Sequence, residues 1–549
     1  MHAGPAQVAQ LSSPLPVWPA LVAAAVLFSV GIALTLARPR GAWARRLRKR
    51  LLLGVPWGTL LTIAGVVAFY LFVQGAWEHP NDPLVIPFRS WSYLYPVGVL
   101  TAAFAHASRS HIVGNVIGTL AFAPIAEYAW SHFPTERGSQ SFGGRRTNPF
   151  LRVFAVPLAA IGVGLLTSLF ALGPVIGFSG VVFAFAGFAL VFAPLAVVVS
   201  LVGAQIISLL YSAVTSPVTV AGTSPQVVTP WFANIAIQGH YIGLLFGVVV
   251  GGWLAARRDY RPSPGRVWLA VVALAVSESL WALYWYAGAE RYVLFRAAGA
   301  VAVFLLAALI AAALTASWRP LISRIDLRRR ETAVGLLLAL TVALSVVAIP
   351  VNLVAVDAKP LPEGVSVGGY DVTYAENVPD QYVSAVNVSL FGQTTQLNTS
   401  GVIVVSEDRN IFQTVVSKTA LAYRGSASVV VGGLGWRQRV AVNRTGWSAV
   451  GNDTAYKVYL RPAGGDRRLV FQSDAVRSRP RIAGRRVVIA PTAEAFELLV
   501  QRGNQSIASH RIPTVGHNVT AGGLTFNRTR GDLYAEANGT RVQIASRAG

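Results

Sequence analysis

Long apolar runs with few or no charged residues recur through the first two thirds of this chain. A run of about 20 apolar residues is long enough to cross the hydrocarbon core of a bilayer as a helix. Charged residues make up only 13% of the chain, about half the share found in a soluble protein. The sequence therefore predicts a polytopic α-helical membrane protein with about ten spans. They are expected near residues 17–37, 52–74, 111–130, 153–172, 233–255, 267–287, 297–317 and 333–356, with two more merged over 177–214 and turning near Pro194.

The net charge of +23 comes almost entirely from arginine, and many of the arginines cluster between the apolar runs. Arginine and lysine beside a span mark its cytoplasmic end. The clusters around 45–50, 145–152, 257–266 and 328–330 then orient alternate spans and place both termini outside the cytoplasm. We expect a multi-pass protein of the cell membrane. No nucleic-acid-binding motif accompanies the positive charge, so a nucleic-acid partner is not expected.

The character of the sequence changes after residue 356. Short alternating apolar runs, such as 401–405 and 427–431, are separated by turns rich in Gly, Asn and Asp. Alternation with a period of two is typical of strands that bury one face. Residues 357–549 are therefore predicted to form a β-rich, sandwich-like domain outside the membrane. The sequence does not indicate what this domain binds.

Three short segments of the predicted bundle contain the candidate catalytic residues. Ser179 lies between glycines at the start of the fifth span, and His240 lies about two turns into the seventh. His111 and Asn115 lie in the first turns of the third span and, being four residues apart, share one helix face. The topology derived from the arginines places all four residues in the outer part of the membrane.

A serine and a histidine in one membrane site supply a nucleophile and its general base. His111 and Asn115 can donate hydrogen bonds to the oxyanion of a tetrahedral intermediate, and the backbone N–H of Ser179 at a helix N-terminus is a third donor. No aspartate lies between Leu84 and Arg258, so a Ser-His dyad is expected rather than a Ser-His-Asp triad. No cofactor is expected. The chain contains no cysteine, which excludes thiol catalysis and cysteine metal sites.

These segments resemble the rhomboid family of intramembrane serine proteases. The family pattern is His-x4-His-x3-Asn in one helix, Gly-x-Ser-Gly at the start of another, and His-x2-Gly-x3-Gly in a third. The matching residues here are His106, His111, Asn115, Gly177, Ser179, Gly180, His240, Gly243 and Gly247. The resemblance implies Ser179 as the nucleophile, His240 as the base, and His111 and Asn115 at the oxyanion hole. It also suggests a contact between Phe183, where the family often has tyrosine, and the catalytic histidine.

The resemblance covers about residues 51–255 and implies a six-helix protease core there. Residues 1–50 then add an N-terminal transmembrane helix and a basic cytoplasmic loop, and residues 256–356 add three more helices. The partners that the resemblance implies are the lipid bilayer and single-span membrane proteins, which would be cut near the outer face of the membrane.

The external loop at 75–110 departs from the family. Many members carry a Trp-Arg pair before the first motif, whereas this chain has Arg89-Ser90-Trp91 farther upstream. Trp91, Tyr93 and Tyr95 belong to residue types that favour the headgroup level, so part of the loop is expected in the membrane interface.

Two other classes of protein remain open. A catalytically inactive rhomboid-like receptor or trafficking protein would share the fold, although loss of the serine or the histidine would be its signature. A transporter would use an intramembrane carboxylate, for which Glu278 in the predicted eighth span is the candidate, but a buried glutamate more often makes a helix–helix hydrogen bond. Zinc proteases of the His-Glu-x-x-His type and intramembrane aspartyl proteases are excluded, because their motifs are absent.

Overall fold

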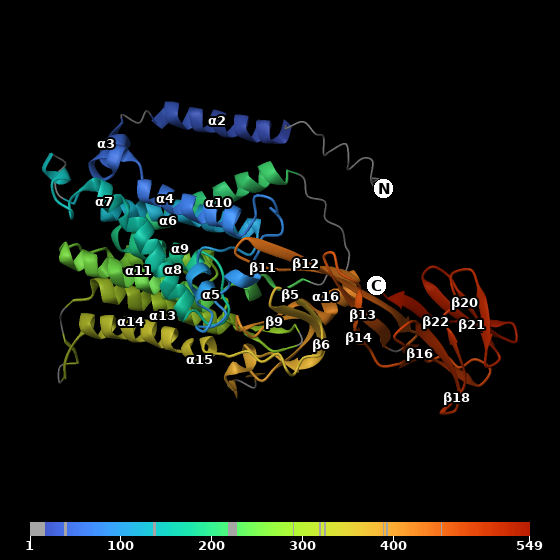
Figure 1. Ribbon diagram of the computed structural model, residues 1–549. Helices are drawn as coiled ribbons and strands as arrows, with labels where there is room; N and C mark the ends of the chain where they lie inside the picture. The colour runs from blue at the N-terminus through green and yellow to red at the C-terminus, as the bar shows by residue number, and fades with distance from the viewer. Residues whose placement is uncertain are drawn as a thin grey trace. The chain divides into compact units, whose positions relative to one another are not determined.

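The chain divides into two compact units, which are described separately below (Figure 1). The computed structural model describes residues 17–37, 41–134, 139–217, 228–288, 290–317, 320–322, 325–387, 389–390, 393–451 and 453–548. The first unit comprises Met1–Trp285 and Tyr292–Leu353, and the second comprises Tyr286–Arg291 and Val354–Gly549. The N-terminal segment 1–16, predicted to lie outside the cytoplasm, falls outside the described residues.

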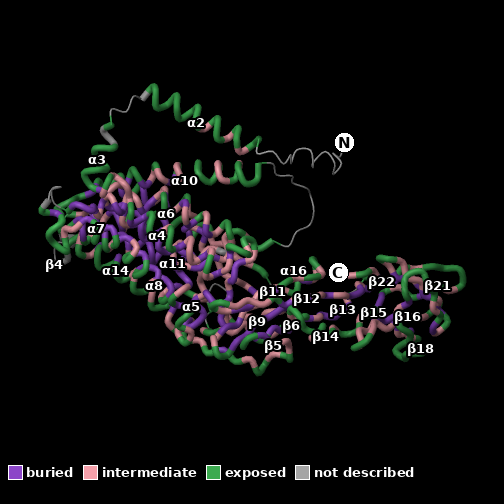
Figure 2. The backbone as a smooth tube through the Cα atoms, turned by 45° about the horizontal axis from the view of Figure 1, so that its top comes forward, coloured by how far each residue is buried: buried purple, intermediate pink, exposed green. Residues whose placement is uncertain are grey.

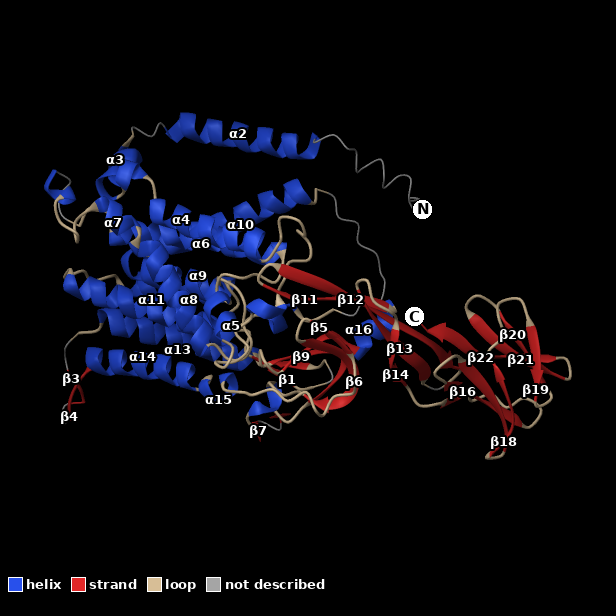
Figure 3. Cartoon of the chain, viewed as in Figure 1, coloured by secondary structure: helices blue, strands red, loops and turns tan. Residues whose placement is uncertain are grey.

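The first unit is built almost entirely from helices, drawn in blue in Figure 3. They are α2 (Val17–Ala37), α3 (Ala42–Arg50), α4 (Trp57–Ala68), α5 (Pro96–Thr101), α6 (Arg109–Trp130), α7 (Pro149–Val153), α8 (Ala155–Phe170), α9 (Ser179–Phe192), α10 (Pro194–Thr215), α11 (Ile237–Arg257), α12 (Pro264–Ser277), α13 (Arg296–Thr315), α14 (Arg329–Val346) and α15 (Ile349–Asn352). Two hairpins join helices, β1 (Tyr284–Tyr286) with β2 (Tyr292–Leu294) and β3 (Pro320–Ile322) with β4 (Ile325–Arg328).

Each of the ten predicted spans contains an apolar helix. Seven of the described helical segments are long and apolar enough to cross a membrane, and three shorter apolar ones cover Trp57–Val73, Ser179–Phe192 and Pro264–Ser277. The predicted turn at Pro194 is confirmed, because α9 ends at Phe192 and α10 begins at Pro194. The chain is therefore a multi-pass membrane protein whose apolar helices suit a lipid environment.

The helices differ sharply in how much of their surface they bury. Nearly every residue of α9 is buried, as expected for a central helix that is apolar on all sides. In contrast, α2 is exposed along most of its length (Figure 2), with Leu27, Phe28 and Leu36 each more than 70% exposed. Apolar side chains with that exposure suit contact with lipid chains.

Glycines allow α9 and α11 to pack closely. A Cβ atom on Gly243 would lie 2.1 Å from the carbonyl oxygen of Gly180, and one on Gly247 would lie 2.1 Å from that of Ala184. Small residues spaced by four are the usual means by which membrane helices bring their backbones together. This contact joins the helix that begins at Ser179 to the helix that carries His240.

The eighth predicted span, 267–287, is longer than the helix that forms there. The helix α12 ends at Ser277, and Ser279 adopts a left-handed backbone conformation with φ of 58°. The aromatic residues that follow have high strand propensity and form β1. The prediction that one helix continues through Glu278 is therefore wrong, because this residue is the C-cap of α12.

The second unit is β-rich, as predicted. Its elements are β5 (Val365–Val367), β6 (Tyr370–Pro379), β7 (Ser389–Leu390), β8 (Gln393–Thr394), β9 (Asn398–Ser406), β10 (Ile411–Ser417), α16 (Lys418–Arg424), β11 (Ser426–Gly433), β12 (Trp436–Ala449), β13 (Thr454–Pro462), β14 (Arg468–Gln472), β15 (Val476–Arg477), β16 (Arg485–Pro491), β17 (Phe496–Arg502), β18 (Gln505–Arg511), β19 (Asn518–Ala521), β20 (Leu524–Arg528), β21 (Asp532–Ala537) and β22 (Thr540–Ala548). The runs at 401–405 and 427–431 lie in β9 and β11.

Three of its sheets have four or more strands. One has the order β10-β9-β6-β5, and a second has the order β15-β16-β17-β18. The largest runs β14-β13-β12-β22-β21-β20-β19, with β11 also paired to β12. Trp447 and Phe526 of the largest sheet share a buried core with Ile489 and Leu498 of the second sheet. Two sheets packed on one core form the predicted sandwich-like arrangement.

Candidate active site

Ser179 and His240 come together in the structure although 61 residues separate them. The hydroxyl oxygen Oγ of Ser179 lies 2.8 Å from Nε2 of His240, which is hydrogen-bonding distance. Ser179 is the first residue of α9. His240 lies in the first turn of α11, earlier than the predicted two turns, because a 3-10 turn at Trp231–Asn234 delays the start of the helix.

An aromatic ring holds the imidazole of His240 from one side. The ring of Phe183 stacks on that of His240, with centroids 4.4 Å apart and planes inclined by 20°. Phe183 is one turn after Ser179 on α9, so a single helix presents both the hydroxyl and the stacking ring. The other ring nitrogen, Nδ1 of His240, has no hydrogen-bond partner among the described residues. The site therefore contains a Ser-His pair without a third polar group behind the histidine.

His111 and Asn115 approach the start of α9 at Gly177. A Cβ atom built on Gly177 would lie 2.6 Å from Nε2 of His111 and 3.6 Å from Nδ2 of Asn115. Gly177 also has φ of 120°, a backbone conformation that favours glycine. Nδ2 of Asn115 is buried and has no hydrogen-bond partner in the described part of the chain. An unpartnered donor at this place is ready to bind a new acceptor.

The tautomer of His111 follows from its backbone neighbour. Nδ1 of His111 accepts from the backbone N–H of Ala107 at 3.4 Å, which leaves the proton on Nε2. Ser108 caps α6, since its hydroxyl accepts from the N–H of His111 at 3.2 Å. The N–H of Ser179 belongs to the first turn of α9, where a helix leaves its donors without internal partners. Three donors are thus available beside the Ser179 hydroxyl.

The segment before Ser179 is held by the loop that precedes α6. Ser90 donates its backbone N–H to the carbonyl of Val175 at 3.1 Å, and Gly177 donates to the carbonyl of Ala102 at 2.8 Å. Nη1 of Arg89 reaches the carbonyl of Pro174 at 3.3 Å. The loop therefore supports the approach to the candidate nucleophile, a role that its composition did not indicate.

Trp91, in the same loop, is buried inside the protein. Its side chain is 1% exposed, and its indole N–H donates to the carbonyl of Ile86 at 2.6 Å. The ring of Trp91 packs inside the protein, so this residue gives no support to the prediction that part of the loop lies in the membrane interface, which stays a prediction. The buried hydrogen bond satisfies the one polar group that the interface would otherwise solvate.

His106 precedes α6 and contacts His111. Its ring meets that of His111 edge to face, with centroids 5.1 Å apart. Its backbone N–H and carbonyl are both bound by the side-chain amide of Gln74, at 2.7 and 2.9 Å. His106 is fully buried and thus acts as packing for the donor His111.

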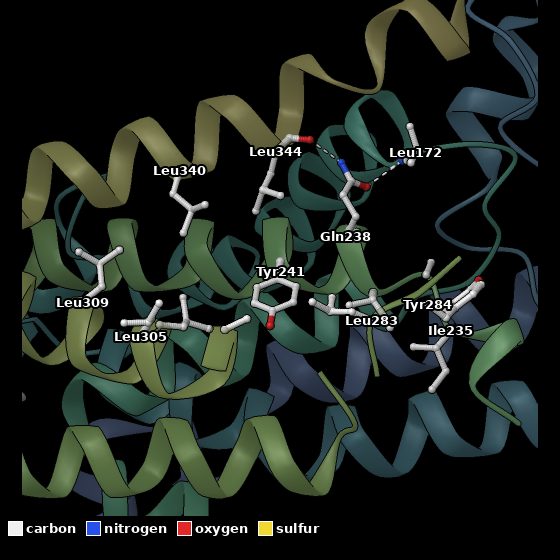
Figure 4. A pocket seen from close by; sticks show the side chains of 15 residues that line it. Leu172, Ile235, Gln238, Tyr241, Leu283, Tyr284, Leu305, Leu309, Leu340 and Leu344 are labelled. Atoms are coloured by element: carbon white, nitrogen blue, oxygen red, sulfur yellow. Dashed lines mark hydrogen bonds between the residues drawn. The ribbon is translucent and has the colours of Figure 1, made fainter. Parts of the chain in front are cut away.

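Gln238 fixes the start of α11, and the sequence motifs gave no sign of it. Nε2 of Gln238 donates to the carbonyls of Phe170 at 2.8 Å and Leu344 at 2.5 Å, and its Oε1 accepts from the N–H of Leu172 at 2.8 Å. Two of these bonds are drawn in Figure 4, where Gln238 reaches toward α14 above an apolar pocket. The amide joins α8, α11 and α14 two residues before His240.

The candidate site opens into a cavity of about 480 Å³. Ser179, His240, His111 and Asn115 all line it. Among the described residues, no group of three or more acidic or histidine side chains could hold a metal ion. The side chains present supply a nucleophile, a base and hydrogen-bond donors around one space, which is the set that acyl transfer requires.

Comparison with known proteins agrees with the motif. A family model described as the Rhomboid domain matches residues 94–257. No curated protein and no solved structure matches the chain. The matched range contains all the candidate site residues and ends at Arg257, the last residue of α11. The helices from α12 onward and the whole β-rich unit lie outside it.

Proposed function

This chain is a member of the rhomboid family, and we propose that it is an intramembrane serine endopeptidase that cuts single-span membrane proteins. The observation that carries the proposal is the 2.8 Å contact between Oγ of Ser179 and Nε2 of His240 inside a cavity that also contains unpartnered donors. A hydroxyl is a weak nucleophile unless a base removes its proton, and a neutral imidazole at this distance can do so.

The proposed reaction begins when Oγ of Ser179 attacks the substrate carbonyl carbon and Nε2 of His240 takes the hydroxyl proton. The carbonyl oxygen becomes an oxyanion, which accepts hydrogen bonds from Nε2–H of His111, Nδ2–H of Asn115 and the N–H of Ser179. His240 then protonates the leaving amine, and the C–N bond breaks to leave an acyl-enzyme. Water, deprotonated by His240, hydrolyses the ester and restores the serine.

The proposed topology follows from the arginine clusters and places Ser179 and His240 near the outer face, with both termini extracytoplasmic. Water is available there, whereas the membrane centre lacks it. A helical substrate keeps its amides bonded within the helix, so we expect cleavage near the outer end of a span where Gly or Pro weakens the helix. Mass spectrometry of the released fragment locates the cut, and a cut in the inner half would contradict this orientation.

We assign the parts of the chain accordingly. Residues 51–255 form the protease core, residues 1–50 and 256–356 add helices around it, and residues 357–549 form an extracytoplasmic domain. The alternative is a catalytically inactive rhomboid-like receptor. The presence of both Ser179 and His240 at hydrogen-bonding distance favours the enzyme. The alternative of a transporter has less support, since its one candidate carboxylate, Glu278, lies at the end of α12 rather than inside a helix.

The test is covalent labelling of the full-length protein by a fluorophosphonate, together with cleavage of a single-span substrate in liposomes. Ser179→Ala is expected to lose both, since the labelled atom and the nucleophile are the same. Ser208→Ala is the matched control, because Ser208 lines the same cavity without contributing to the dyad, and it should keep both activities. Cleavage by Ser179→Ala, or no labelling of the wild type, would overturn the proposal.

A further inference from the structure

The cavity of the candidate site extends beyond the rhomboid domain. Besides Ser179 and His240, it is lined by Ser277, Glu278 and Ser279, at the C-terminal end of α12. The family match ends before α12, so this wall belongs to the additional helices. A carboxylate thus faces the space in which the substrate of the proposed protease would lie.

The turn that carries Glu278 is fixed to the helix that carries His240. Glu278 donates its backbone N–H to the carbonyl of Leu274 at 2.9 Å, and Leu280 donates to that of Ala275 at 2.8 Å. Leu280 is fully buried, and its carbonyl accepts from the hydroxyl of Tyr241 at 3.2 Å. Tyr241 follows His240 directly. The position of Glu278 is therefore set relative to the dyad.

The carboxylate of Glu278 has no hydrogen bond or ion pair within the described residues. Glu127, in the same unit, shows the opposite arrangement. It is fully buried and accepts from the backbone N–H groups of Gly58 and Thr59, from the Thr59 hydroxyl and from His132, at 2.7 to 2.8 Å. Burying an unpaired carboxylate is costly. The chain satisfies Glu127 internally and leaves Glu278 open to the cavity.

Glu278 does not act on the dyad itself. Nδ1 of His240 has no partner, so no carboxylate orients the imidazole. The titratable side chains that line the same cavity are His111 and His240, and neither is paired with Glu278. What an open carboxylate beside a peptidase dyad can bind is a cationic side chain of the substrate.

We propose that Glu278 is a specificity-determining residue that binds a lysine or arginine side chain of the substrate close to the cleaved bond. This inference rests on the proposed protease function. Long basic side chains bury their alkyl stems along apolar walls while the charged group reaches a polar partner, which suits a cavity with one carboxylate. A substrate with glutamate at the same position would be rejected by repulsion.

The test compares substrates that differ at one residue. The purified full-length protein in zwitterionic liposomes is given single-span substrates with Lys, Gln or Glu scanned through the positions flanking the cut. At one position we expect kcat/KM to be about 10- to 100-fold higher for Lys than for Gln, the ratio that one charged hydrogen bond supports. Glu278→Gln should remove this preference, and Glu278→Lys should transfer it to the Glu substrate.

Two controls separate this inference from the proposed function. Ser277→Ala alters a neighbouring wall residue and should keep the lysine preference. Fluorophosphonate labelling of Ser179 reports the dyad in every variant. If the wild type is labelled and cuts substrate without any lysine preference, or if Glu278→Gln keeps the preference or loses labelling, the subsite is refuted while the protease stands. If the wild type is neither labelled nor active, the protease proposal fails first.

Discussion

Gly177→Ala tests whether the close approach of His111 to the start of α9 matters for catalysis. The new methyl carbon would lie 2.5 Å from Cε1 and 2.6 Å from Nε2 of His111, closer than real Cβ atoms come to other heavy atoms. His111 must therefore move away. The φ of 120° adds backbone strain of about 1–3 kcal/mol for a residue with a side chain. A displaced oxyanion donor lowers kcat by about 10²–10³.

Gly173→Ala is the matched control for the backbone strain that a side chain causes at positive φ. Gly173 also has a positive φ, 78°, but a Cβ atom there would meet nothing within 4 Å. Both variants should lose thermal stability through backbone strain, and Gly177→Ala should lose more because its methyl group also displaces His111; only Gly177→Ala should lose cleavage of a single-span substrate in liposomes. Wild-type kcat in Gly177→Ala, or an equal loss of kcat in Gly173→Ala, would refute the reasoning.

Three further predictions concern other parts of the molecule. Asn115→Ala should lower kcat by about 10²–10³ with KM unchanged in the same cleavage assay, because its unpartnered donor acts when charge develops; a change in KM alone would make it a substrate-positioning residue. Glu127→Ala should lower the free energy of unfolding by about 3–5 kcal/mol, whereas the exposed Glu78→Ala should lower it little. Equal stabilities of the two variants would contradict a stabilising role for the hydrogen bonds of Glu127. Protease added to intact cells should remove the region after about Asp357, and a protected domain would invert the proposed topology.

The residues that meet at the candidate site could be predicted because the motifs that carry them are local in sequence. Glycines on both sides of Ser179 and the spacing of His111 and Asn115 are visible without a structure, and the arginine clusters independently predict that these residues lie at corresponding ends of their spans. The contact between Phe183 and His240 was expected from the resemblance to the rhomboid family, which often has tyrosine at this position, and the two rings do stack. Helix periodicity alone predicts only that His111 and Asn115 share a helix face.

The supporting contacts could not be predicted, because they join distant backbone groups. Gln238 binds carbonyls of α8 and α14, and a lone glutamine in an apolar run carries no motif. The end of α12 was missed for a different reason. The run continues apolar through Leu283, so hydropathy extends the span, whereas the positive φ of Ser279 and the aromatic strand that follows end it. Local conformation overrode composition there.

The proposed mechanism needs an explanation of how a histidine works without a carboxylate behind it. In a triad, the carboxylate orients the imidazole and stabilises the imidazolium. Here orientation comes from packing, since Phe183 stacks on the ring and Gln238 anchors the first turn of α11. The face of an aromatic ring attracts a cation, so Phe183 also stabilises His240 when it takes the proton of Ser179. A carboxylate behind His240 would be a second buried charge in the membrane, and its desolvation would cost more free energy than its interaction with the imidazolium would recover. An aromatic face orients and stabilises the base without that cost.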